Sequence, residues 1–117
     1  RKRTRIAAPD TSIRFDTPRC GDRIDLDFSI KDGRISHIGF KVRGCALCEA
    51  SSEVLAKNAI GYQLQELNKV GNKLSDYLVG TLDNPDWEGF EIFEPVKSVP
   101  SRHECVLLPF NAMRKAI

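Results

Sequence analysis

The segment between residues 23 and 42 alternates apolar and polar side chains on both sides of an Asp32-Gly33 pair. Such alternation is typical of β-strands with one buried face, and Asp-Gly is a strong signal for a two-residue hairpin turn. The inward-facing residues are Ile24, Leu26, Phe28 and Ile30 in the first strand, and Ile38, Phe40 and Val42 in the second. Because a weaker alternation in residues 12–16 precedes this hairpin, the chain is predicted to form a three-stranded antiparallel sheet.

After the hairpin the apolar period becomes helical. Three helices are predicted, over residues 46–60, about 64–79, and from 101 onward. Gly61 and Gly80 are expected to stop the first two helices. Ser101 and Glu104 fit a capping box for the third helix, and Pro109 is expected to kink or loosen it. Because the strands come first and the helices follow, the sequence predicts an α+β domain.

The apolar positions also predict which side of each helix is buried. The predicted faces are Leu47, Ala50, Val54 and Leu55 in the first helix, Leu67, Val70, Leu74, Tyr77 and Leu78 in the second, and Val106, Phe110, Met113 and Ile117 in the third. Trp87 and Phe90 are expected to fold an intervening loop back onto the core. Residues 90–93 are predicted to form a short helical turn or a strand.

The composition fits a single domain with an ordinary core. The 117 residues are 41% hydrophobic, so the domain can be stable without disulfides or metal. The formal net charge of +2 does not favour nucleic-acid binding, and no apolar run is long enough to span a bilayer. The four cysteines indicate reduced thiols and a cytoplasmic protein. Residues 1–16 are interpreted as a lead-in segment with a basic start, and residues 17–117 as the domain.

Three cysteines lie at predicted ends of elements. Cys20 is on a loop next to Gly21, Cys45 directly precedes the first helix, and Cys105 lies in the first turn of the last helix. A helix N-terminus stabilises a thiolate, and the Asp22 carboxylate can join thiolates around one soft metal ion. Each cysteine taken alone could equally be a small buried hydrophobe. Together they favour a site for zinc or an iron–sulfur cluster.

Three neighbouring residues are weaker candidates. Cys48 forms a Cys-x-x-Cys pair with Cys45, as in thioredoxin-like redox sites, but the preceding strand belongs to a hairpin rather than to a βαβ unit. Cys48 is therefore interpreted as an auxiliary thiol or reserve ligand, and His103 is a second reserve ligand. Arg102, three residues before Cys105, is a candidate for steadying its thiolate.

These motifs resemble the IscU/SufU/NifU N-terminal family of iron–sulfur cluster assembly scaffold proteins. The matching segments are Pro18-Arg19-Cys20-Gly21-Asp22-Arg23-Ile24, Gly33-Arg34-Ile35, Gly44-Cys45-Ala46-Leu47, Ala50-Ser51, and Arg102-His103-Glu104-Cys105 with Leu108. The resemblance covers residues 17–117. It implies a three-stranded antiparallel sheet with helices packed on one face. It also implies a surface site at which Cys20, Asp22, Cys45 and Cys105 meet.

The resemblance further implies a function. Members of the family accept persulfide sulfur from a cysteine desulfurase, assemble a transient [2Fe–2S] cluster or hold zinc, and pass sulfur or cluster to apo iron–sulfur acceptor proteins. Cys105 is the expected persulfide acceptor, with Arg102 beside it. Glu104 stands where IscU-type members have histidine, and the Arg102-x-x-Cys105 spacing places the chain nearer the SufU type. Cys48 stands where serine is usual.

Two alternative functions use the same residues. In a zinc-dependent sulfurtransferase of SufU type, the persulfide itself would be the product rather than a cluster. In a structural or regulatory zinc-binding module, the metal would only support the fold or a partner-binding surface. The residues favour a scaffold over an enzyme. Neither nucleic acid nor a membrane is an expected partner.

Overall fold

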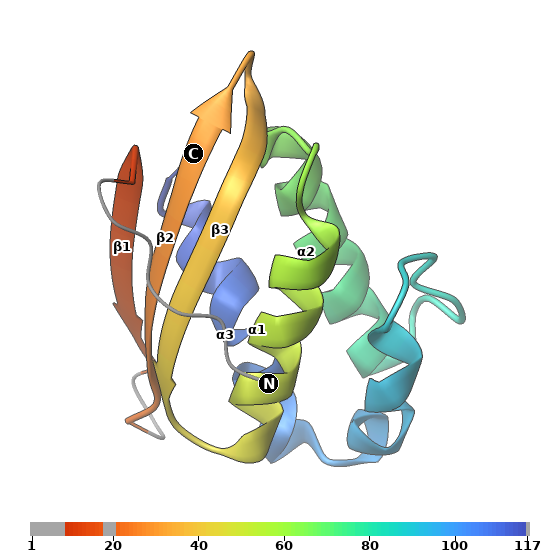
Figure 1. Ribbon diagram of the computed structural model, residues 1–117. Coiled ribbons are helices and arrows are strands. Elements are labelled where there is room, and N and C mark those ends of the chain that lie inside the picture. The colour runs from red at the N-terminus through yellow and green to blue at the C-terminus, as the bar shows by residue number, and fades with distance from the viewer. Residues whose placement is uncertain (1–8, 18–20, 117) are drawn as a thin grey trace.

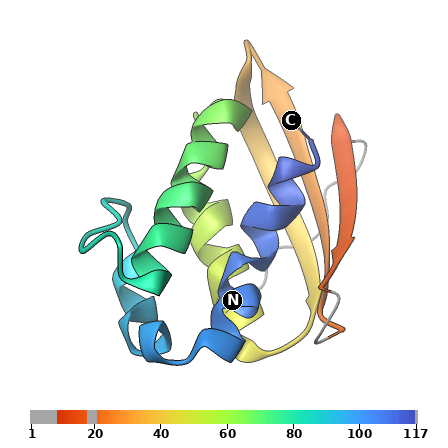
Figure 2. The ribbon, with the colours of Figure 1, turned by 180° about the vertical axis from the view of Figure 1, so that it is seen from behind.

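The computed structural model describes residues 9–17 and 21–116. The elements are β1 (Thr11–Asp16), β2 (Arg23–Lys31), β3 (Arg34–Arg43), α1 (Ala46–Asn58), α2 (Leu64–Val79), the 3-10 helices η1 (Phe90–Ser98) and η2 (Pro100–Arg102), and α3 (His103–Arg114). The strands form an antiparallel sheet in the order β1-β2-β3, and the helices cover one of its faces (Figure 1). The reverse view shows α3 between the sheet and the viewer (Figure 2). The α+β prediction is confirmed.

The hairpin forms where its sequence predicts it. Asp32 and Gly33 both have positive φ, 55° and 78°, which matches the right-handed twist of the flanking strands. The predicted inward residues of β2 and β3 are buried, apart from Ile30 and Val42, which are half-buried. β1 pairs with β2 along its whole length, so Thr11–Asp16 of the lead-in segment 1–16 belongs to the same sheet.

The buried face of α1 differs from the prediction. Its buried residues are Cys48, Ser51, Ser52, Leu55 and Ala56, whereas Leu47, Ala50 and Val54 are half-buried. The two serines can be buried because their hydroxyls donate to backbone carbonyls, Ser51 to Val106 in α3 and Ser52 to Cys48 at 2.8 Å. Small side chains thus bring α1 against α3. The helix also ends at Asn58, two residues earlier than predicted.

α2 matches its prediction over its full length. Its predicted apolar face is buried, and Gly80 ends the helix in the left-handed conformation, with φ of 91°. Gly71 has a packing role in the middle of the helix. A Cβ at this position would lie 3.2 Å from Cβ of Phe110, so the missing side chain lets α2 approach α3 closely.

The start of α3 corrects the predicted capping box. Ser101 lies inside η2, and α3 begins at His103 with no side-chain cap. Pro100 starts a 3-10 turn one residue earlier, so Ser101 is already helical and cannot adopt the extended N-cap conformation. The helix continues through the buried Pro109 to Arg114. Ile117, predicted to face the core, lies outside the described residues.

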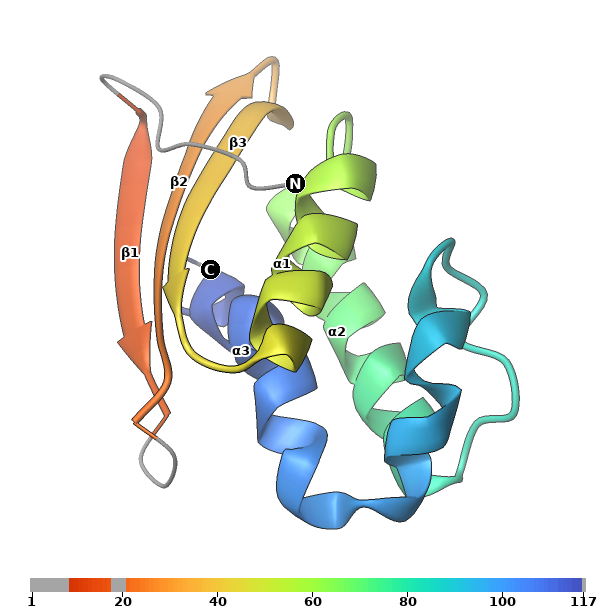
Figure 3. The same cartoon turned by 60° about the horizontal axis from the view of Figure 1, so that its bottom comes forward.

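An aromatic cluster holds the segment between α2 and α3 in place. The Trp87 ring packs against Phe90 at 5.0 Å between centroids, and the Trp87 indole N–H donates to the Tyr62 hydroxyl at 2.9 Å. Phe90 also packs against Phe110, at 5.6 Å. The predicted return of this loop to the core is confirmed, and residues 90–93 are helical rather than extended. η1 lies beside α2 on the side away from the sheet (Figure 3).

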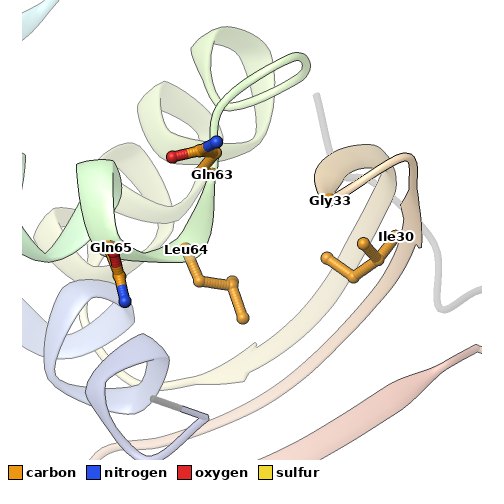
Figure 4. A pocket seen from close by; sticks show the side chains of 5 residues that line it. All are labelled: Ile30, Gly33, Gln63, Leu64 and Gln65. Atoms are coloured by element: carbon orange, nitrogen blue, oxygen red, sulfur yellow. The ribbon is translucent and has the colours of Figure 1, made fainter.

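An open pocket lies at the far end of β2, away from Asp22. Its lining residues are Ile30, Gly33, Gln63, Leu64 and Gln65, between the hairpin turn and the start of α2 (Figure 4). None of these side chains is ionisable or nucleophilic, so the pocket offers no catalytic group. Within residues 9–17 and 21–116, no helix is both long enough and apolar enough to cross a membrane.

Candidate functional site

Four potential ligands meet at one end of the domain. Asp22 directly precedes β2, Cys45 lies between β3 and α1, Cys48 is in the first turn of α1, and Cys105 is in the first turn of α3. The antiparallel pairing of β2 with β3 brings the start of one strand beside the end of the other, which places Asp22 next to Cys45. One ligand atom from each of the four side chains lies within 4.8 Å of all the others.

The Asp22 carboxylate is the centre of this group. Its Oδ2 accepts hydrogen bonds from the Cys48 thiol at 3.2 Å and from the Cys105 thiol at 3.4 Å. The Cys45 and Cys48 sulfurs lie 3.7 Å apart. The Asp22 backbone is fixed by Thr17, because the Asp22 N–H donates to Oγ1 of Thr17 and the Thr17 N–H donates to the Asp22 carbonyl. The carboxylate is therefore held with little freedom.

Cys45 is the most accessible of the three described thiols and the most readily ionised. It is half-buried, whereas Cys48 and Cys105 are 0% and 1% exposed. Partial burial raises the pKa of Cys45, but hydrogen bonding with the Cys48 backbone N–H and contact with the Cys105 and Cys48 thiols outweigh it. The net effect lowers the pKa below its ordinary value. Cys45 is also the N-cap of α1, where the helix dipole favours an anion.

Burial favours the protonated form of the other two thiols. Burial, with hydrogen bonds to Cys45 and Asp22, raises the pKa of Cys105 to about 12, although a hydrogen bond with Arg102 opposes this shift. Burial and the contact with Asp22 raise the pKa of Cys48 well above its ordinary range. Three neighbouring thiols thus differ strongly in their tendency to ionise.

The structure brings together three of the four predicted principal ligands, Asp22, Cys45 and Cys105. Cys20 lies outside the described residues, so its position in the site stays a prediction. Of the two reserve ligands, Cys48 belongs to the group and His103 does not. The His103 imidazole points to η1, where its Nε2 lies 3.0 Å from the Val96 carbonyl oxygen.

Sequence reasoning missed the residues that position the site. Thr17 fixes the Asp22 backbone, and Ser51 ties α1 to α3 and so sets Cys45 and Cys48 against Cys105. Gly44 leaves room for the Asp22 side chain, since a Cβ there would lie 2.9 Å from its Oδ1. The sequence contains one signal for these residues, which is that they lie near the cysteines. Gly44 directly precedes Cys45, and Ser51 is on α1, as Cys48 is.

The donor set fits a zinc ion. Thiolate sulfur and carboxylate oxygen are both zinc ligands, and neighbouring donors in a tetrahedral zinc site lie about 3.8 Å apart for Zn–S bonds of about 2.3 Å. Of the proposed ligands, the Cys105 sulfur lies 3.4 Å from Oδ2 of Asp22, and the donors of Asp22, Cys45 and Cys105 all lie within 4.8 Å of one another. Small side-chain movements would therefore bring them to zinc-binding geometry. A bound zinc ion would supply a positive charge that keeps its thiol ligands deprotonated.

Replacing Gly44 with alanine is expected to weaken zinc binding without unfolding the domain. The new Cβ would displace the Asp22 carboxylate, with which it would overlap. We expect a loss of roughly 10–100-fold in zinc affinity, the usual effect of disturbing the support of a metal ligand. Competition with a chromophoric chelator measures it, and Asp22→Asn is the matched variant. Unchanged affinity in the alanine variant would show that Asp22 does not need its present position.

The fold and this site define a class of small α+β domains that gather cysteine thiols and one carboxylate at a single edge. Within that class, the chain belongs to the family described as the NifU-like N terminal domain, which it matches over residues 2–86. The predicted family is thereby confirmed.

Known relatives are similar to this chain over most of its length. The iron-sulfur cluster assembly scaffold protein IscU of Streptococcus pyogenes serotype M1 is 28% identical over 109 residues, which cover 91% of this chain and 68% of the relative. The zinc-dependent sulfurtransferase SufU of Bacillus subtilis (strain 168) is 24% identical over 107 residues, 90% of this chain and 73% of the relative. The crystal structure of a nitrogen-fixing NifU-like protein (N-terminal) from Brucella abortus superimposes with a TM-score of 0.82 at 30% identity, covering 92% of this chain and 76% of that one.

Proposed function

We propose that this chain is an iron–sulfur cluster assembly scaffold that receives persulfide sulfur and assembles a transient [2Fe–2S] cluster. The observation that carries the proposal is the grouping of Asp22, Cys45 and Cys105, together with Cys48, within 4.8 Å. Cys20, Asp22, Cys45 and Cys105 are the proposed ligands. Three thiolates bind iron firmly, while a single oxygen ligand is weaker and favours release. The similarity to a relative named as an IscU scaffold supports the same function.

The proposal includes partners and a compartment. A cysteine desulfurase would supply the sulfur, and apo iron–sulfur proteins would receive the cluster. Cys45, Cys48 and Cys105 are free thiols, and free thiols persist in a reducing compartment such as the cytoplasm.

Cys45 is the thiol best suited to accept the sulfur first. The sequence analysis predicted Cys105 for this role, but Cys105 is 1% exposed and its pKa is raised to about 12. Cys45 is half-buried and its pKa is lowered. Transfer of sulfur needs an accessible thiolate, so we assign the first persulfide to Cys45 and keep Cys105, with Arg102 beside it, as a ligand and a later acceptor.

A zinc-dependent sulfurtransferase is the second candidate function. It is supported by the fit of the donor set to zinc and by the similarity to a relative named as a zinc-dependent sulfurtransferase. Here zinc would be held by the same ligands, and the persulfide would be passed on without a cluster. After sulfur transfer, the site of a scaffold would hold a [2Fe–2S] cluster, whereas the site of a sulfurtransferase would hold zinc and a persulfide.

Anaerobic reconstitution separates the two functions. The protein is incubated with ferrous iron, cysteine and a cysteine desulfurase, and visible absorption, iron and sulfide are measured. A cluster that forms in the wild type, but not in the Cys20, Cys45 or Cys105 serine variants, would support the scaffold. If no cluster forms while zinc stays bound and a persulfide appears, the protein is a sulfurtransferase.

Zinc affinity is expected to rise with pH. A thiol must lose its proton to bind zinc, and with a pKa of about 12 Cys105 is protonated throughout the neutral range. Each proton released makes the apparent affinity increase about tenfold per pH unit. We therefore expect at least a tenfold gain per unit between pH 6 and pH 8. Chelator competition, corrected for the protonation of the chelator, measures it, and a pH-independent affinity would exclude Cys105 as a ligand.

A further inference from the structure

Cys48 lies inside the site although the proposed ligand set does not need it. Its thiol is 0% exposed, its sulfur lies 3.7 Å from that of Cys45, and it donates to Oδ2 of Asp22 at 3.2 Å. Residues three apart on a helix lie on the same face, one turn from each other. A disulfide has an S–S length of about 2.0 Å, so the two sulfurs must approach by only about 1.7 Å to form one.

The burial of Cys48 separates its chemistry from that of Cys45. A partner enzyme can reach Cys45, which is half-buried, but not a thiol that is 0% exposed. Cys48 can react only with a group that is already attached inside the site. The Cys45 sulfur lies 3.7 Å away, and Asp22 orients the Cys48 thiol beside it. This arrangement of one accessible and one enclosed thiol suits an initial acceptor and a second thiol that resolves the adduct.

A [2Fe–2S] cluster contains sulfide, whereas the terminal sulfur of a persulfide is two electrons more oxidised. We propose that Cys48 is a resolving thiol that reduces a persulfide on Cys45 and releases its terminal sulfur as hydrosulfide within the site. This proposal rests on the proposed function, because it assumes that Cys45 receives persulfide sulfur. Under this proposal, the thiol sulfurs of Cys45 and Cys48 supply the two electrons that reduce one persulfide sulfur to sulfide.

The reaction is a thiol–disulfide exchange in which the persulfide takes the place of the disulfide. The Cys48 sulfur attacks Sγ of Cys45, a Cys45–Cys48 bond forms, and the bond from Sγ to the terminal sulfur breaks. Hydrosulfide leaves with that electron pair, and the Cys48 proton passes to the Asp22 carboxylate that it already contacts. Two thiol sulfurs are oxidised and one sulfur is reduced by two electrons. A dithiol reductant then returns the disulfide to two thiols for the next cycle.

A first experiment tests the resolving chemistry without any partner enzyme. The metal-free full chain is treated with one equivalent of 5,5′-dithiobis(2-nitrobenzoate), which forms a mixed disulfide on an accessible thiol and releases one thionitrobenzoate. In the wild type we expect a second equivalent to leave as Cys48 attacks, with a Cys45–Cys48 disulfide found by peptide mass mapping. In Cys48→Ser we expect one equivalent and a stable adduct on Cys45. The proposal is overturned if the wild type keeps its adduct, or if Cys48→Ser releases the second equivalent equally fast.

A second experiment uses a cysteine desulfurase, the class of enzyme that we propose as the sulfur donor. The protein is loaded by a cysteine desulfurase and cysteine, separated from free cysteine, and assayed for sulfide and for protein mass. We expect hydrosulfide release from the wild type to be at least tenfold faster than from Cys48→Ser, which should keep a persulfide on Cys45. Equal release from two persulfidated proteins would overturn the resolving role and leave the scaffold function standing. If neither protein accepts sulfur, the acceptor function fails, while the first experiment still decides whether Cys48 resolves adducts on Cys45.

Discussion

Replacing Cys105 with serine is expected to abolish tight metal binding while the domain stays folded. A serine hydroxyl remains protonated at neutral pH, so the site loses one of its proposed thiolate ligands. We expect at least a hundredfold loss of zinc affinity, since disturbing even the outer partners of a metal ligand costs roughly 10–100-fold. The change in volume is small, and the new hydroxyl can donate to Oδ2 of Asp22, as the thiol does at 3.4 Å.

This variant also distinguishes a functional site from a structural zinc module. Zinc content and chelator competition report the loss of metal, while circular dichroism and thermal unfolding report the fold. The metal-free wild type is the reference for stability, and Cys48→Ser is the matched variant within the same group of thiols. A Cys105→Ser protein that is unfolded, together with a wild type that unfolds when its metal is removed, would favour the structural module. A folded variant with normal zinc affinity would remove Cys105 from the ligand set.

Replacing Phe90 with alanine is expected to cause the largest loss of stability that we predict. Phe90 is 0% exposed and its ring contacts those of Trp87, Phe93 and Phe110. Truncating a buried phenylalanine costs about 3–5 kcal/mol through lost burial and the cavity that remains. Because a domain is typically stable by only about 5–15 kcal/mol, the melting temperature should fall by roughly 10–25 °C. Denaturant and thermal unfolding measure both quantities.

The matched control lies two residues further along the same 3-10 helix. Ile92 is 53% exposed, so Ile92→Ala is expected to change the free energy of unfolding by no more than about 0.5 kcal/mol. If the two alanine variants were equally stable, the aromatic cluster would not hold η1 against the rest of the domain. Metal binding by Phe90→Ala should persist below its melting temperature, because this ring cluster supplies none of the described ligands.

The hairpin and α2 could be predicted because their local signals agree with their packing. The Asp32-Gly33 turn and the alternation of apolar residues both specify the same register of β2 and β3. In α2 the apolar stripe coincides with the buried face. The face of α1 could not be predicted in this way. Ser51 and Ser52 are polar in any hydropathy pattern, and they can be buried because their hydroxyls donate hydrogen bonds to backbone carbonyls.

The site was only partly predictable for a similar reason. The sequence indicates that Cys45 and Cys105 lie at element ends, but the direction of a side chain on a first helical turn depends on its neighbours. His103 turns away from the thiols because carbonyls of η1 lie within reach of its imidazole, and the length of η1 was not predicted. Cys48 turns into the site, where its thiol donates a hydrogen bond to Asp22. Both outcomes depend on contacts between segments that are distant in the sequence.

The contact between Asp22 and Cys105 joins positions 83 residues apart, and Cys105 lies on the last helix in chain order. A chain that is still being synthesised therefore has no complete site until that helix has emerged and packed against α1. A partial set of ligands binds a metal ion weakly. Under the proposed function, the order of the elements therefore means that only a finished and correctly folded domain can hold a metal ion tightly.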